Sequence, residues 1–283
     1  MQLLVNGANA YCYTGGKPFD AAKPTVVFIH GVLNDHSVWI LQSRYLAHHG
    51  YNVLAVDLPG HCRSGGEAPE TVEQAAAFIV ALLDAAGVEK AALVGHSWGS
   101  LIALEAASRL GARATHLVMV GTAYPMKVSP ALLETSLQEP MKTLTMINMF
   151  SRSTLAAPPS SLGPGPWVDG ASMALGRRVL ASNTAVNVFH PGFKACDSYA
   201  GGEAAMAQVQ CPVLFVLGDQ DQMTSPKAAQ TLVQAAKAAG VRSETVRIAV
   251  GHHQMTEAPE ETLSALRQFL ASMGAELTPE PPC

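Results

Sequence analysis

Short apolar runs rich in β-branched residues recur along the chain, and a glycine closes or follows most of them. Runs of this kind cover 25–30, 52–57, 91–95, 116–121 and 212–218, and a further strand pattern covers 243–249. Because they have no polar face, such runs are typical of strands that are buried in a parallel sheet. Consecutive parallel strands need a crossover connection, so this feature constrains the fold more than any other in the sequence.

Segments with a helical pattern lie between these runs and provide the crossovers. They cover about 37–49, 71–86, 98–110, 226–239 and 260–273. Residues 2–5 and 9–14, joined by the turn Asn6-Gly7, predict an antiparallel hairpin at the start of the chain. The whole pattern predicts an α/β fold with a mostly parallel eight-stranded sheet flanked by helices.

One region, 124–206, interrupts this alternation. Strand patterns stop there, and Met, Pro, Ser and Gly dominate, most densely at 158–161 and 163–166. We expect a helical cap inserted after the sixth strand, so that 1–123 and 207–274 form the core and 275–283 a flexible tail. Six of the methionines fall in the insertion. They suit either a surface that adapts to apolar ligands or ordinary helix packing.

Composition excludes several classes of function. The chain carries 18 Lys and Arg against 22 Asp and Glu, a formal net charge of −4, so the basic excess used in nucleic-acid binding is missing. No apolar stretch approaches the length of a membrane span. The five cysteines are scattered and never in Cys-x-x-Cys spacing, which indicates neither a disulfide framework nor a zinc site. We expect a cytoplasmic protein without cofactor or metal, either a monomer or a homodimer.

The segment Gly95-His-Ser97-Trp-Gly99 fits the pattern Gly-x-Ser-x-Gly at the junction of an expected strand with an expected helix. Small residues at 95 and 99 allow a sharp turn that lifts the Ser97 hydroxyl clear of the sheet. A serine hydroxyl needs a base within hydrogen-bond reach to act as a nucleophile. The alternative interpretation is a helix N-cap serine flanked by glycines.

Candidates for the base and for the acid that orients it follow later strands. Asp219 and Asp221 lie in the loop after 212–218, and His252 and His253 come directly after the last strand pattern. Loops at the carboxyl ends of parallel strands meet at one edge of a sheet, so Ser, Asp and His are expected close together there.

With these residues the chain resembles the α/β-hydrolase superfamily, of the capped single-domain kind, over nearly its whole length. His30-Gly31 is similar to the family's oxyanion loop, the segment 57–64 (Asp-Leu-Pro-Gly-His-Cys-Arg-Ser) to its Asp-x-Pro-Gly-x-Gly-x-Ser loop, and Gly251-His252 to its terminal Gly-His element. The sequence departs from the pattern at Cys62, where glycine is usual, and in the insertion, which matches no particular subfamily.

The resemblance implies a triad of Ser97, Asp221 and His252. Asp221 occupies the family's Gly-x-x-Asp position and is favoured over Asp219, which would brace the loop. His252 directly follows the glycine and is favoured over His253, which would point elsewhere. The same analogy assigns the two oxyanion-hole donors to the backbone N–H groups of Val32 and Trp98.

The nucleophile also narrows the reaction. Relatives similar to epoxide hydrolases and haloalkane dehalogenases form their covalent intermediate on an aspartate, whereas this chain has Ser97. We therefore expect hydrolysis of carboxylic esters of small to medium apolar substrates through an acyl-enzyme. Two alternatives stay open: hydrolysis of C–C bonds, lactones or amides by the same triad, and a non-catalytic ligand receptor on the same fold.

Overall fold

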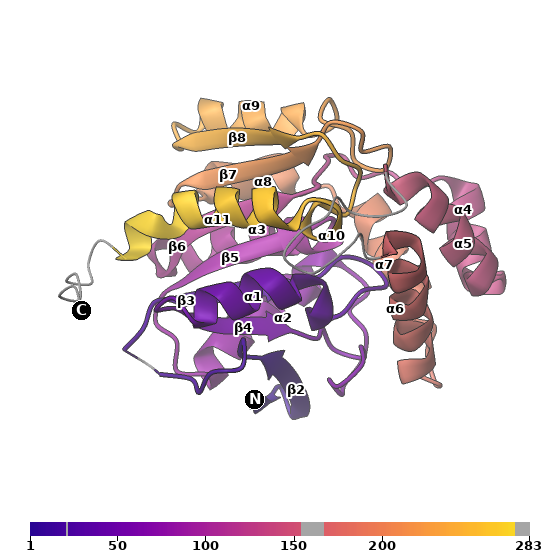
Figure 1. The fold of residues 1–283 in the computed structure, drawn as a ribbon, viewed down its shortest axis with the longest axis horizontal. Helices are drawn as coiled ribbons and strands as arrows, with labels where there is room; N and C mark the ends of the chain where they lie inside the picture. The colour runs from indigo at the N-terminus through magenta and orange to yellow at the C-terminus, as the bar shows by residue number, and fades with distance from the viewer. Residues whose placement is uncertain (21, 154–166, 275–283) are drawn as a thin grey trace.

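The computed structural model describes residues 1–20, 22–153 and 167–274 and contains one eight-stranded sheet. The strands are β1 (Gln2–Val5), β2 (Ala8–Tyr13), β3 (Thr25–Ile29), β4 (Asn52–Val56), β5 (Ala91–His96), β6 (Ala114–Val120), β7 (Val213–Gly218) and β8 (Ser243–Ile248). Their order is β1-β2-β4-β3-β5-β6-β7-β8, with antiparallel pairs only at β1–β2 and β2–β4. The predicted α/β fold with a mostly parallel sheet is confirmed (Figure 1).

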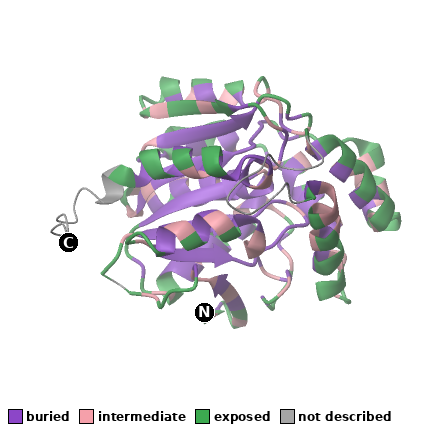
Figure 2. Cartoon of the chain, viewed as in Figure 1, coloured by how far each residue is buried: buried purple, intermediate pink, exposed green. Residues whose placement is uncertain are grey.

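Helices cover both faces of the sheet, which Figure 2 shows as buried. One face packs against α2 (Val72–Ala85), α3 (Trp98–Leu110), α8 (Gly202–Gln208) and α9 (Gln230–Ala238). The other packs against the 3-10 helix η1 (His36–Trp39), α1 (Ile40–Ala47) and α11 (Pro259–Gly274). In β3, Val27 and Ile29 point to the first face and Val26 and Phe28 to the second, because successive side chains of a strand alternate.

Four of the helices between β6 and β7 form a group beyond one end of the strands (Figure 1). They are α4 (Pro130–Gln138), α5 (Pro140–Ser151), α6 (Val168–Ser182) and α7 (Phe189–Ser198). Leu144, Val179, Phe189 and Phe193 form their own apolar cluster, which Leu33 joins from the core. The two Pro-rich and Gly-rich segments at 158–161 and 163–166 and the tail at 275–283 lie outside the described residues.

Two details differ from the sequence expectation. The helix α9 begins at Gln230, four residues after the start expected at 226. The helix α8 extends across residue 206, where the insertion was expected to end. This helix packs against α3, and its Ala205 and Met206 belong to the hydrophobic core. Among the described helices, none combines the length and apolar character that a bilayer crossing requires.

Candidate active site

Ser97 lies at a sharp turn between β5 and α3. Its φ of 53° and ψ of −121° are unfavourable for a residue with a side chain. A Cβ atom at Gly95 would lie 2.0 Å from the carbonyl oxygen of Gly99, and one at Gly99 would lie 2.4 Å from that of Ile29. The turn therefore closes only with glycine at both flanking positions, which gives the physical reason for the Gly-x-Ser-x-Gly pattern.

Asp221 and His252 form a buried pair. Nδ1 of His252 lies 2.8 Å from Oδ2 of Asp221. The other carboxylate oxygen accepts the backbone N–H groups of Met223 and Thr224 at 2.8 Å, and the Thr224 hydroxyl donates to Oδ2 at 2.7 Å. Burial alone would raise the pKa of Asp221, but the charge of His252 and these hydrogen bonds outweigh it and lower the pKa. Asp221 is thus held as a carboxylate that orients the imidazole.

The neighbouring candidates have other contacts. Asp219 forms a surface ion pair with Arg247. The backbone N–H of His253 donates to Glu257, and its ring faces the cavity that contains Ser97. Of the two acids and two bases considered from the sequence, the structure joins Asp221 to His252.

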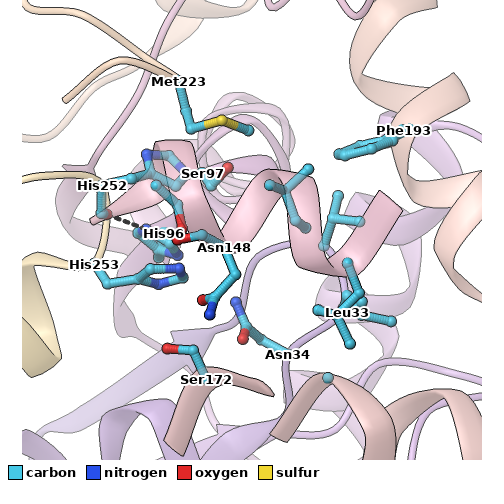
Figure 3. A pocket seen from close by; sticks show the side chains of 15 residues that line it. Leu33, Asn34, His96, Ser97, Asn148, Ser172, Phe193, Met223, His252 and His253 are labelled. Atoms are coloured by element: carbon cyan, nitrogen blue, oxygen red, sulfur yellow. Dashed lines mark hydrogen bonds between the residues drawn. The ribbon is translucent and has the colours of Figure 1, made fainter. Parts of the chain in front are cut away.

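A cavity of about 60 Å³ lies in front of Ser97 (Figure 3). Ser97 and His252 both line it, together with Asn34 from the core and Asn148 from α5. Within the described part of the chain, no hydrogen bond joins the Ser97 hydroxyl to the His252 ring. Contacts between a nucleophile and its base are often long without substrate and shorten in the complex.

The loop after β3 supplies the next wall of this cavity. A Cβ atom at Gly31 would lie 3.2 Å from Cβ of Ser97, so the loop backbone runs close to the turn, and Val32 lines the cavity. Trp98 is the first residue of α3, a position whose N–H has no acceptor within the helix. The structure therefore places the backbone of both expected oxyanion donors beside Ser97.

His96 supports the loop that carries His252. Its Nε2 lies 2.8 Å from the backbone carbonyl of His252. Burial, followed by the proximity of His252 and His253, lowers the pKa of His96 well below its usual value. A neutral imidazole then donates this hydrogen bond, so His96 has a supporting role beside the turn.

Glu257 also supports this loop, and sequence analysis missed it. It lies in the one-turn helix α10 (Gln254–Glu257) and is fully buried. Its carboxylate accepts four hydrogen bonds, from the N–H and hydroxyl of Ser153 and from the N–H groups of Gly251 and His253. Because Ser153 follows α5, this carboxylate ties the inserted helices to the histidine loop. The one signal for Glu257 in the sequence was its position five residues after His252.

One group of side chains has the composition of a metal site. Atoms of Asp35, His36 and Asp57 lie within 4.8 Å of one another. However, Oδ2 of Asp35 accepts from the guanidinium of Arg178 in α6 at 2.7 Å, and its Oδ1 accepts from the N–H and hydroxyl of Ser37. Asp57 accepts from the backbone N–H of His36 at 2.9 Å. These donors make the group a hydrogen-bonded link between α6 and the core.

Cys62, the departure from the family pattern, borders this group. Its φ of 46° lies in the left-handed region that favours glycine, which explains why glycine is usual there. The thiol lies 3.3 Å from Oδ2 of Asp35. Burial, followed by the charge of Asp35, raises the pKa of Cys62 to about 12, so the sulfur stays a protonated donor.

Comparison with known proteins places this architecture in a family. A family model described as alpha/beta hydrolase fold matches residues 24–162, which include the β3 loop and the Ser97 turn. The chain belongs to the α/β-hydrolase superfamily. The resemblance inferred from the sequence motifs is thereby confirmed.

Two curated relatives match a part of this hydrolase chain. A dihydrolipoyllysine-residue acetyltransferase component of the acetoin cleaving system of Cupriavidus necator is 42% identical over 84 residues, which are 29% of this chain and 22% of the relative. Epoxide hydrolase A of Mycobacterium tuberculosis is 35% identical over 102 residues, which are 34% and 30% of the two chains. The similarity thus spans less than a third of the length of either relative.

Solved structures extend the similarity to the whole α/β-hydrolase fold. The enol-lactonase of Burkholderia xenovorans LB400 superposes with a TM-score of 0.78 and 20% sequence identity, covering 96% of this chain and 100% of the lactonase. At this identity, the comparison shows a shared fold.

Proposed function

We propose that this α/β-hydrolase cleaves carboxylic esters of small to medium apolar substrates through an acyl-enzyme on Ser97. The observation that carries the proposal is the buried Asp221–His252 pair, whose histidine lines the same cavity as Ser97 at its strained turn. A hydroxyl raised on such a turn beside an oriented imidazole is the arrangement that nucleophilic acyl transfer needs.

The reaction follows from these positions. His252 accepts the proton of Ser97 as Oγ attacks the ester carbonyl carbon, and the carbonyl oxygen becomes an oxyanion. The N–H groups of Val32 and Trp98 donate to that oxyanion. When the C–O bond to the alcohol breaks, His252 returns the proton to the leaving oxygen. Water then attacks the acyl-enzyme with His252 as base, which releases the acid and restores Ser97.

Despite the similarity to an epoxide hydrolase, we do not propose epoxide hydrolysis for this chain. The resemblance assigns an aspartate nucleophile to epoxide hydrolases, and this chain has Ser97 at the turn. The fold shared with an enol-lactonase agrees with a second candidate, because a lactone is a cyclic ester opened by the same attack. C–C bonds, amides and a non-catalytic receptor role are the remaining alternatives.

The proposed substrate is a small molecule, and the proposed location is the cytoplasm. The structure agrees with the second point, because Cys12, Cys62, Cys196 and Cys211 are free thiols, as a reducing compartment maintains them.

Labelling with a serine-reactive phosphonate tests the mechanism. We expect one adduct per chain, mapped to Ser97 by peptide mass spectrometry and missing in Ser97→Ala. The same variant should lose about 10⁴-fold or more in kcat on an active ester, while its thermal unfolding midpoint stays close to wild type.

Ser108→Ala in the same helix α3 is the matched control and should keep both the adduct and the turnover. Folded wild-type protein that forms no adduct and hydrolyses no ester would contradict the proposal and favour the receptor role.

A further inference from the structure

A second cavity, of about 290 Å³, lies between the core and helix α6. Most of its wall is apolar, and its lining includes Val38, Leu41, Ala171, Ala174, Leu175 and Met255. It thus lies between η1 and α1 on one side and α6 on the other, with α10 at one end. We refer to it as the apolar chamber.

The apolar chamber and the catalytic cavity share three lining residues, Asn34, Ser172 and His253. Figure 3 shows Asn34 and Ser172 on the opposite side of the catalytic cavity from Met223. Because the same three side chains border both spaces, the spaces adjoin there. We call Asn34, Ser172 and His253 the neck.

The polar atoms of the neck have unused hydrogen-bonding capacity. Among the residues that the structure describes, the amide of Asn34, the hydroxyl of Ser172 and the ring nitrogens of His253 have no hydrogen-bond partner. Burial, together with nearby His252, lowers the pKa of His253 to about 3, so its imidazole is neutral, with one ring nitrogen able to donate and the other able to accept. All three side chains line both cavities, so these polar groups are free to pair with a polar group of a molecule that occupies the neck.

The sizes of the two spaces show what that ligand must be. A volume of about 60 Å³ in front of Ser97 holds about four to six water-sized groups, which is enough for an ester group and a short arm. The larger chamber would leave its apolar wall wet unless an apolar group fills it. A longer substrate therefore passes from Ser97 through a polar constriction into an apolar space.

We propose that the apolar chamber binds a medium-length apolar chain of the substrate and that the neck binds a polar group, a hydroxyl or an amide, carried by that chain close to the scissile ester. The proposal rests on the proposed ester hydrolysis. It narrows the substrate class to esters and lactones that are polar beside the reacting carbonyl and apolar beyond it.

Filling the apolar chamber by mutation tests whether it binds the apolar chain of the substrate. Ala174 is exposed on α6 and lines the chamber, so Ala174→Phe places a ring in it with little effect on the core. We expect wild type to prefer p-nitrophenyl octanoate to the acetate, by about fourfold in kcat/KM for each methylene that enters the chamber. Ala174→Phe should lower the octanoate-to-acetate ratio at least tenfold.

Ala181→Phe is the matched control, because Ala181 is exposed on the same helix and lines neither cavity. The octanoate-to-acetate ratio of Ala181→Phe should equal that of wild type. The ratio of octyl acetate to ethyl acetate distinguishes a chain on the alcohol side from one on the acyl side. A chamber that holds neither chain would leave both ratios unchanged in Ala174→Phe, and that result would overturn the proposal.

Binding measured without turnover separates this inference from the reaction itself. In a Ser97→Ala background, calorimetric titration with 2-decanone should show affinity that Ala174→Phe weakens at least tenfold and Ala181→Phe does not. If wild type hydrolyses no ester but this pattern holds, the proposed reaction fails and the chamber stands. If esters are hydrolysed and 2-decanone binds equally to all three proteins, the chamber assignment fails alone.

The neck has its own test. We expect wild type to hydrolyse p-nitrophenyl 3-hydroxyoctanoate about tenfold better in kcat/KM than the octanoate, because the hydroxyl pairs with the neck. Ser172→Ala should reduce this preference, and Ala181→Phe should keep it. Equal rates for the two esters in wild type would refute a polar role of the neck.

Discussion

At the scale of single residues, the candidate site depends on which of two nearby aspartates contacts His252. Asp219 and Asp221 both follow β7, and only three-dimensional neighbours distinguish the carboxylate that meets His252 from the one that meets Arg247. Thr224 carried no signal in the sequence, because its role depends on how the loop folds back on Asp221. Backbone donors such as the N–H of Val32 have no side-chain signature at all.

Replacing each aspartate separately tests this distinction. Asp221→Asn removes the charge that orients His252 and stabilises its imidazolium form, so kcat on an active ester should fall by about 10³ to 10⁴. Asp219→Asn loses one exposed ion pair, worth about 0 to 1 kcal/mol, and should keep kcat within about twofold. Steady-state kinetics of both variants decides the matter. A reversed pattern would assign the acid to Asp219.

At the scale of elements, long apolar runs, amphipathic segments and the helical character of the insertion were predictable, whereas the one-turn helix and the bounds of the inserted helices were not. The strands β3, β4, β5 and β7 are buried on both faces, so their hydrophobicity is continuous and easily recognised. The helix α10 has four residues, too few to show a helical period. The helices of the insertion pack in a small cluster of their own, and Pro, Gly and Ser are frequent between them, so the sequence did not indicate where each helix begins and ends.

The tie between the insertion and the histidine loop leads to a prediction for Glu257. In Glu257→Gln an amide NH₂ replaces one acceptor and faces N–H donors, so at least one hydrogen bond within a fully buried group is lost. We expect the free energy of unfolding to fall by about 1 to 3 kcal/mol, and kcat to fall because the His252 loop is less well held. Urea denaturation and ester kinetics measure the two effects.

Glu260→Gln provides the comparison for Glu257, since Glu260 is an exposed residue of the first turn of α11. Its free energy of unfolding should stay within about 0.5 kcal/mol of wild type. Equal stability of the two variants would show that the buried carboxylate holds nothing in place.

At the scale of the whole molecule, histidines buried without charge connect the site to the stability of the fold. His30, His61, His96 and His253 all lie at the end of the sheet that carries the candidate site, and burial is the main cause that lowers the pKa of each. The sequence showed these histidines beside the expected motifs. It did not show how deeply the inserted helices and the loops around Ser97 would bury them.

The expected consequence is a loss of stability in mild acid. The pKa of His61 falls from 6.5 to about 4 and that of His253 to about 3, so between pH 6.5 and 4 the unfolded chain binds protons that the folded chain does not. The free energy of unfolding therefore decreases as the pH falls through this window, by up to about 1.4 kcal/mol per pH unit for each such histidine.

Carboxylates act at lower pH, which allows the two effects to be separated. The hydrogen bonds from Ser37 help to lower the pKa of Asp35 from 3.8 to about 2 despite its burial. The stabilisation that Asp35 contributes is therefore present above pH 3.8 and is lost below that value.

Urea denaturation at pH 7, 6 and 5 should thus report the histidines. His61→Gln keeps a donor near the carbonyl of Pro59 but does not titrate, so its free energy of unfolding should fall less steeply than that of wild type. A wild-type free energy of unfolding that stays constant from pH 7 to 5 would mean that the folded chain takes up as many protons as the unfolded chain in this range. The lowered pKa values of these histidines would then be wrong.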